Sequence, residues 1–131
     1  MKFSNEKPPN YEEMLAHFPL IEKFKPVFAY GDTVYNPFHV VLTPDLIYHE
    51  AVHLKQQGMD PEAWYREYLT NATFRFTQEL EAYQEQYRFF SRHVKDRELV
   101  SHLLSALAEA LSSALYGKLT TFSEARKLIR G

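Results

Sequence analysis

Hydrophobic residues recur at intervals of four and three in the middle of the chain, which is the spacing of one face of an α-helix. This row consists of Phe76, Leu80, Tyr83, Tyr87 and Phe90. Polar residues occupy the opposite side of the same segment. The sequence therefore predicts one long amphipathic helix from about residue 72 to residue 93.

Start and stop signals predict further helices on both sides of this one. Thr43 is the expected N-cap of a helix with Pro44 at its first position, and Gly58 ends it after Gln57. The other expected helices are a short one in the first twenty residues, opened by Asn10 and Glu13 as in a capping box and ended by Pro19, then 61–69, 96–116 and a last short one opened by Ser123.

One stretch departs from the helical pattern and predicts a β-hairpin. Residues 27–30 and 33–36 are rich in strand-forming side chains, and Gly31 and Asp32 form a turn between them. A chain of 131 residues is long enough for a single core. We therefore expect one domain, residues 1–131, of the α+β class: mainly α with a small β-hairpin or sheet.

Composition narrows the classes of partner and compartment. A formal charge of −2 provides no basic surface, so we expect no nucleic-acid binding. The most apolar stretch, Leu99 to Tyr116, is interrupted by His102 and Glu109, which predicts a core helix and no membrane span. The N-terminus has no apolar segment typical of a signal peptide, so a cytoplasmic protein is expected.

The helix expected over residues 44–57 contains the stretch YHEAVHLKQQG, which carries the candidate chemistry. His49 and His53 are four residues apart, so both imidazoles lie on one side of the helix and can hold one metal ion. Both are expected along the edge of a largely apolar stripe. That stripe consists of Leu46, Ile47, Glu50, Ala51 and Leu54.

Glu50 follows the first histidine directly, so it can reach a metal-bound water without being a ligand. A zinc ion lowers the pKa of such a water toward about 7, and a carboxylate can then take its proton. The alternative interpretation is three ordinary polar side chains on the edge of a helix. Because the chain has no cysteine, any metal must be held by His, Asp or Glu.

A third ligand distinguishes these interpretations, and the best candidate is Glu79. Its carboxylate lies inside the edge of the apolar row of the long helix, where an unpaired charge is costly. Either a metal shared with His49 and His53 or an ion pair with Arg75, one turn earlier, would satisfy it. Glu81 lies nearly opposite on the helix and is expected in solvent.

The motif HEAVH, followed by Glu79-x-x-Ala82-Tyr83, resembles the gluzincin metallopeptidases. In that family HExxH and a glutamate from a second helix hold zinc, often in an E-x-x-A-[D/Y] setting. The resemblance covers about residues 43–90. The short chain and the H-x-x-Q extension at Gln56 are similar to the minimal, often phage-encoded members.

The resemblance implies a minimal zincin-like core of an active-site helix and a glutamate helix. It implies a Zn²⁺ ion held by His49, His53 and Glu79, with Glu50 as general base in the hydrolysis of a peptide or protein substrate. Tyr83 stands where many larger members have aspartate. It is expected either to accept a hydrogen bond from a ligand histidine or to donate one to the oxyanion. Further candidates for the donor are Tyr87, Tyr116 and His102.

Three interpretations of function and one question about the hairpin stay open from the sequence alone. The strand Thr33–Asn36 either pairs with extended substrate backbone as an edge strand or only covers the core. The protein is either a zinc peptidase or a zinc-stabilised binding module with weak or no hydrolysis. A helical domain without metal is the third interpretation.

Overall fold

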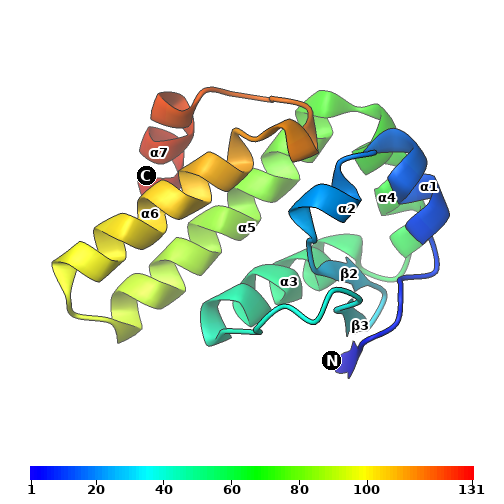
Figure 1. Cartoon of the computed structure of the whole chain (residues 1–131), viewed down its shortest axis with the longest axis horizontal. Coiled ribbons are helices and arrows are strands. Elements are labelled where there is room, and N and C mark those ends of the chain that lie inside the picture. Colours follow the sequence, from blue (N-terminus) through cyan, green and yellow to red (C-terminus); the bar gives the residue numbers. More distant parts are fainter.

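The structure is a computed structural model that describes residues 1–131. It confirms a mainly α protein with one small sheet (Figure 1). The helices are α1 (Tyr11–His17), α2 (Ile21–Phe24), α3 (Pro44–Gln57), α4 (Pro61–Thr70), α5 (Ala72–His93), α6 (Arg97–Leu111), the 3₁₀ helix η1 (Ala114–Tyr116) and α7 (Phe122–Arg130). The strands are β1 (Lys2–Ser4), β2 (Phe28–Tyr30) and β3 (Thr33–Tyr35).

The two helices that carry the candidate ligands have the predicted boundaries. Gly58 ends α3 with a φ of +58°, a conformation that is costly for residues with a Cβ. Asn71 begins α5 because its side-chain oxygen accepts a hydrogen bond from the backbone N–H of Phe74. Local signals in the sequence therefore set the ends of both helices.

Two other predicted helix starts are wrong in detail. The backbone of Asn10, at φ −101° and ψ 21°, is not extended, and its side chain caps no N–H of α1. Both of its amide atoms are buried without a partner, so there is no capping box with Glu13. The last helix is capped by Thr121 rather than Ser123, because the Thr121 hydroxyl accepts from the N–H of Glu124.

The apolar helix α6 is shorter than predicted. It ends at Leu111, and the hydroxyl of Ser112 then bonds back to the carbonyl of Ala108. The chain continues into η1, where the carbonyl of Tyr116 accepts a hydrogen bond from Nε of Arg75 in α5. The predicted helix is thus interrupted between Leu111 and Ala114.

By length and apolarity alone, the segment Arg97–Tyr116 is also a candidate membrane span. In the structure it is divided between α6 and η1, and one side of α6 packs against α5 and α7 (Figure 1). Only 22% of the apolar window is buried, so it is less buried than the predicted core helix. The cluster at this contact consists of Tyr83, Leu104, Leu107, Ala108, Leu111, Ala125 and Ile129.

The predicted hairpin is present but belongs to a sheet of three strands in the order β1-β3-β2. β2 and β3 pair antiparallel, and β1 pairs parallel with β3 through Phe3 and Val34. β3 is therefore the central strand, so the proposal that Thr33–Asn36 binds substrate as an edge strand is wrong. The three residues of β1 are too few and too polar to predict this partner from sequence.

Helix α5 runs through the middle of the protein, with α6 and α7 on one side and α3 and α4 on the other (Figure 1). The row of α3 that is buried consists of Asp45, His49, Glu50, His53 and Gln57. The row of α5 that is buried consists of Arg75, Glu79, Ala82, Tyr83 and Gln86. Leu46, Ile47, Ala51 and Leu54 are only half-buried.

The prediction that the histidines lie on the edge of a mainly apolar stripe is therefore wrong, because they lie in the centre of the buried face. The two helices meet through polar side chains, and the apolar clusters lie elsewhere. Such an interface is stable only if its polar groups have partners.

We predict that Ala82→Leu lowers the free energy of unfolding by about 1–3 kcal/mol, since Ala82 is fully buried and a larger side chain overpacks the interface. The matched control is Ala106→Leu on the exposed side of α6, which should change stability by less than about 0.5 kcal/mol. Urea denaturation measures both. Equal effects of the two substitutions would contradict close packing around Ala82.

Candidate metal centre

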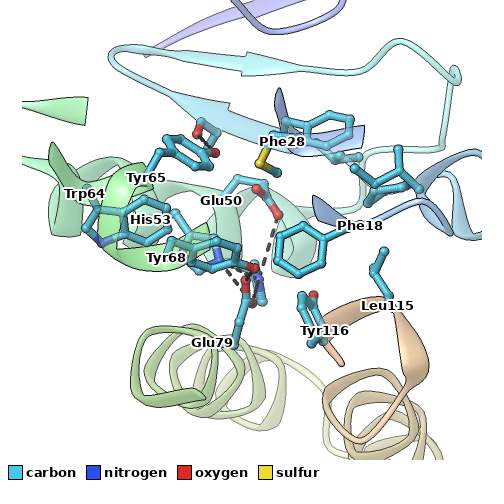
Figure 2. A pocket seen from close by; sticks show the side chains of 16 residues that line it. Phe18, Phe28, Glu50, His53, Trp64, Tyr65, Tyr68, Glu79, Leu115 and Tyr116 are labelled. Atoms are coloured by element: carbon cyan, nitrogen blue, oxygen red, sulfur yellow. Dashed lines mark hydrogen bonds and ion pairs between the residues drawn. The ribbon is translucent and has the colours of Figure 1, made fainter. Parts of the chain in front are cut away.

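Three potential metal ligands meet between α3 and α5 (Figure 2). Nε2 of His53 lies 3.1 Å from Nε2 of His49 and 3.2 Å from Oε1 of Glu79. Nε2 of His49 lies 3.4 Å from the same carboxylate oxygen. All three side chains are buried, so the sequence prediction that brought these residues together agrees with the geometry.

The tautomer of His49 is fixed by a chain of side chains behind it. Its Nδ1 lies 2.9 Å from Oε1 of Gln86, whose Nε2 donates to Oδ2 of Asp45 at 2.8 Å. A carboxylate only accepts, so the amide of Gln86 must turn its oxygen toward the ring. Nδ1 therefore carries the hydrogen, and Nε2 presents its lone pair to the centre.

The ring of His53 is oriented in the same way, by a side-chain amide. Its Nδ1 lies 2.8 Å from Oε1 of Gln56, and Nε2 of Gln56 donates to the carbonyl of Gln78 and to the carboxylate of Glu81. Both acceptors fix the amide orientation, so Nδ1 is the donor and Nε2 faces the centre. Glu81 is exposed as predicted, but its bond to Gln56 was not predicted.

With both rings neutral, two imidazole lone pairs and a carboxylate oxygen thus converge on one point. Like partial charges at this distance repel one another, so the arrangement needs either a metal ion or a proton between them. Ligand atoms bound to a tetrahedral divalent ion at about 2.0–2.2 Å lie about 3.3–3.5 Å from one another. The three candidate ligand atoms of this site are separated by similar distances. The residues present therefore fit a first-row divalent ion with N and O ligands.

The electrostatics of the bare cluster lead to the same conclusion. Burial alone would lower the pKa of His53, but the negative charge of Glu79 and its hydrogen bond raise that pKa to about 9. Burial opposes ionisation of Glu79, yet the two imidazoles hold the pKa of its carboxyl well below the usual range. Without a metal, a proton takes the place of the cation.

The alternative ion pair between Glu79 and Arg75 is wrong. The guanidinium of Arg75 donates instead to the backbone carbonyls of Tyr68 and Tyr116. No ion pair of the protein contains Arg75. The carboxylate of Glu79 is left to the two histidines.

Tyr68 of α4 completes the surroundings of Glu79 and was missed by sequence reasoning. Its hydroxyl donates to Oε2 of Glu79 at 2.6 Å, which leaves Oε1 facing the histidines. Burial and the charge of Glu79 raise the pKa of Tyr68 well above its usual value, so the phenol keeps its proton. The only signal in the sequence is the aromatic face of α4, formed by Trp64, Tyr65 and Tyr68.

Glu50 lies beside the three candidate ligands and forms no hydrogen bond with any of them. Its side chain is buried, and Oε2 lies 3.8 Å from Nε2 of His49. Burial raises the pKa of its carboxyl, and no hydrogen bond from the protein offsets that cost. In Figure 2 Glu50 stands on the far side of the centre from Glu79, among aromatic side chains.

Tyr83 does not accept a hydrogen bond from a ligand histidine, so that prediction is wrong. Gln86, one turn further along α5, takes this role for His49. The ring of Tyr83 packs edge-on against the His49 ring at a centroid distance of 4.4 Å. Its hydroxyl lies 2.8 Å from that of Tyr116, so the two phenols form a hydrogen-bonded pair.

Two cavities border the centre. The inner one has a volume of about 60 Å³ and contacts both histidines, Glu50 and Glu79. The outer one has about 300 Å³ and contacts His49, Glu50, Tyr83 and Tyr116. The other two predicted candidates for an oxyanion donor, Tyr87 and His102, line neither cavity.

Comparison of the chain with models of protein families, with curated proteins and with solved structures gives no match. The geometry of the site is therefore the basis for a proposal about function.

We predict that Glu79→Ala abolishes stoichiometric zinc binding, because the centre loses its only anionic donor. The control is Glu85→Ala on the same helix, whose carboxylate contacts Arg88 and not the centre. Metal analysis of both purified variants after zinc loading and dialysis tests this. Full zinc content in Glu79→Ala would contradict the assignment.

We further predict that Tyr68→Phe weakens zinc binding about 10- to 100-fold, since it removes the donor that orients Glu79. Tyr65→Phe is the matched control, because its hydroxyl donates to the carbonyl of Ala29 and not to the centre. Competition with a zinc chelator gives both affinities. An equal loss in the two variants would indicate a general effect on stability.

Proposed function

We propose that the protein is a zinc-dependent peptidase that hydrolyses a peptide bond in a peptide or protein substrate. The observation that carries the proposal is the buried carboxylate of Glu50, which lies next to three convergent ligands and has no hydrogen-bond partner. Its nearest charged neighbour is Nε2 of His49 at 3.8 Å, which is beyond hydrogen-bond distance. A buried carboxylate that accepts no hydrogen bond and borders a cavity is suited to exchange a proton with a bound molecule.

His49, His53 and Glu79 would hold the ion, with one position left for a water or a substrate. When bound, zinc supplies Lewis acidity: it lowers the pKa of water to about 7 and polarises a carbonyl group. The three ligands are oriented by Gln86, Gln56 and Tyr68, so the protein does not need to reorganise during the reaction.

Glu50 would act as general base and then as general acid. Its pKa is raised by burial, which brings the carboxylate closer to the range in which it can accept and return a proton. The inner cavity that it lines, with about 60 Å³, has room for a few water molecules. The proton taken from water would pass to the leaving amine.

The hydroxyl pair of Tyr116 and Tyr83 is the candidate donor to the oxyanion. Burial and the charge of Glu79 raise the pKa of both phenols, so both keep their protons. Both line the outer cavity together with Glu50. A fixed donor near the carboxylate that handles the proton is the arrangement that stabilises developing negative charge.

We predict that Glu50→Gln retains the fold and the bound zinc but lowers peptidase activity by at least about 100-fold, because the amide cannot accept a proton. Activity is measured with a quenched fluorescent peptide library and zinc by metal analysis. Glu85→Ala is the control, because its carboxylate contacts Arg88 and not the centre. Undiminished activity of Glu50→Gln would exclude Glu50 as the base.

The second candidate function is a zinc-stabilised binding module with little or no hydrolysis. The small inner cavity favours it, because a substrate backbone does not fit into about 60 Å³ without movement of the wall. This alternative needs the three ligands but not Glu50. The same Glu50→Gln variant therefore separates the two functions, since a binding module would work normally with glutamine at this position.

A further inference from the structure

Arg75 is a buried cation with no acidic partner. The residue is 8% exposed and lies one helical turn before Glu79 on α5. Its Nη1 donates to the carbonyl of Tyr68 at 2.7 Å and its Nε to that of Tyr116 at 3.1 Å. These carbonyls belong to the last turns of α4 and η1, whose negative ends attract a cation.

The remaining nitrogen, Nη2, makes no hydrogen bond with the protein. It is the atom nearest to Gly117, where an added Cβ would stand 3.7 Å away. Arg75 and Gly117 both line a cavity of about 300 Å³ that is separate from the two at the metal centre. Nη2 is thus a charged donor that borders a cavity and has no acceptor in the protein.

The walls of this cavity define the chemistry of a ligand. They are apolar around the guanidinium, with His17 as the only other ionisable side chain. The ring of Phe18 lies under the guanidinium at 5.1 Å, so the charge is held between an aromatic face and the cavity. The apolar wall residues are Phe18, Pro19, Leu20, Leu69, Ala114 and Leu115.

We propose that this cavity binds a small organic acid, with its carboxylate on Nη2 of Arg75 and a short apolar body against the wall. Carboxylates form strong charge-assisted hydrogen bonds with guanidinium groups, and the apolar wall favours a carbon chain over a hydrated ion. The site is distinct from the metal centre and does not depend on the proposed hydrolysis. Phe18 and Leu115 line both this cavity and the inner one.

In the simpler interpretation, Arg75 only holds α4 and η1 together and water occupies the cavity. In that role Nη1 and Nε hold the two backbones, and Nη2 donates to water. The two interpretations differ in whether the cavity distinguishes an acid from its uncharged amide.

The test uses the full zinc-loaded chain and three probes: 4-methylpentanoate, its amide 4-methylpentanamide, and inorganic phosphate. Calorimetry or NMR titration measures each affinity. We expect the acid to bind at least about tenfold more tightly than the amide, the difference produced by one charge-assisted hydrogen bond. Phosphate, which has no apolar body, should bind more weakly than the acid.

Variants locate the binding. Ala114→Leu fills the cavity without touching the bonds of Arg75, and should weaken binding of the acid at least about tenfold. Ala106→Leu on the exposed side of α6 is the matched control and should leave it unchanged. Arg75→Lys keeps the charge but removes the planar fork and should also weaken binding. If Arg75→Lys does not fold, the comparison of Ala114→Leu with Ala106→Leu still tests the proposal.

Three results would overturn the proposal. Equal affinity for the acid and the amide would show an apolar cavity without an anion site. Tighter binding of phosphate than of the acid, lost in Ala114→Leu, would assign the site to a free inorganic anion. Absence of binding by all three probes at millimolar concentration would leave Arg75 as a structural residue only.

Discussion

Two imidazole nitrogens and a carboxylate oxygen meet within 3.4 Å between α3 and α5, and either a metal ion or a proton must offset their mutual repulsion. Neither ring can turn away, because Gln86 and Gln56 hold the opposite nitrogen of each one. Neither amide can flip, because each donates to a fixed oxygen. Gln86, Gln56 and Tyr68 thus hold the three candidate ligands in place, and α3 packs on α5 around them.

This constraint explains why the central helix contact is polar. Most buried polar groups of the contact have hydrogen-bond partners, which offset their desolvation cost, and Glu50 is the exception. Ala82 allows the backbones to approach, and the apolar clusters on either side supply the hydrophobic stabilisation. Arg75 connects this scaffold to its surroundings, since it binds the backbones of Tyr68 and Tyr116, whose side chains reach the centre and its cavity.

Much of the candidate site could be predicted from local sequence. The ends of α3 follow from Pro44 and Gly58, and helical spacing places both histidines on one side of it. Glu79 could be identified because a carboxylate on a buried helix face needs a partner. The hairpin followed from Gly31 and Asp32 between two strand-like segments. These features depend on residues within one or two helical turns or one tight turn.

The sequence by itself therefore determined the bounds of α3 and α5, the hairpin, and which side chains share a helix face, because backbone geometry fixes these within a short segment. Tertiary structure alone decided which faces meet. It selected Gln86, 37 residues from His49, rather than Tyr83 to orient the ring, and it joined η1 to α5 through the bond of Arg75 to Tyr116, 41 residues away. It also made β3 a central strand by adding β1. Such contacts depend on the simultaneous packing of several elements, which no local pattern contains.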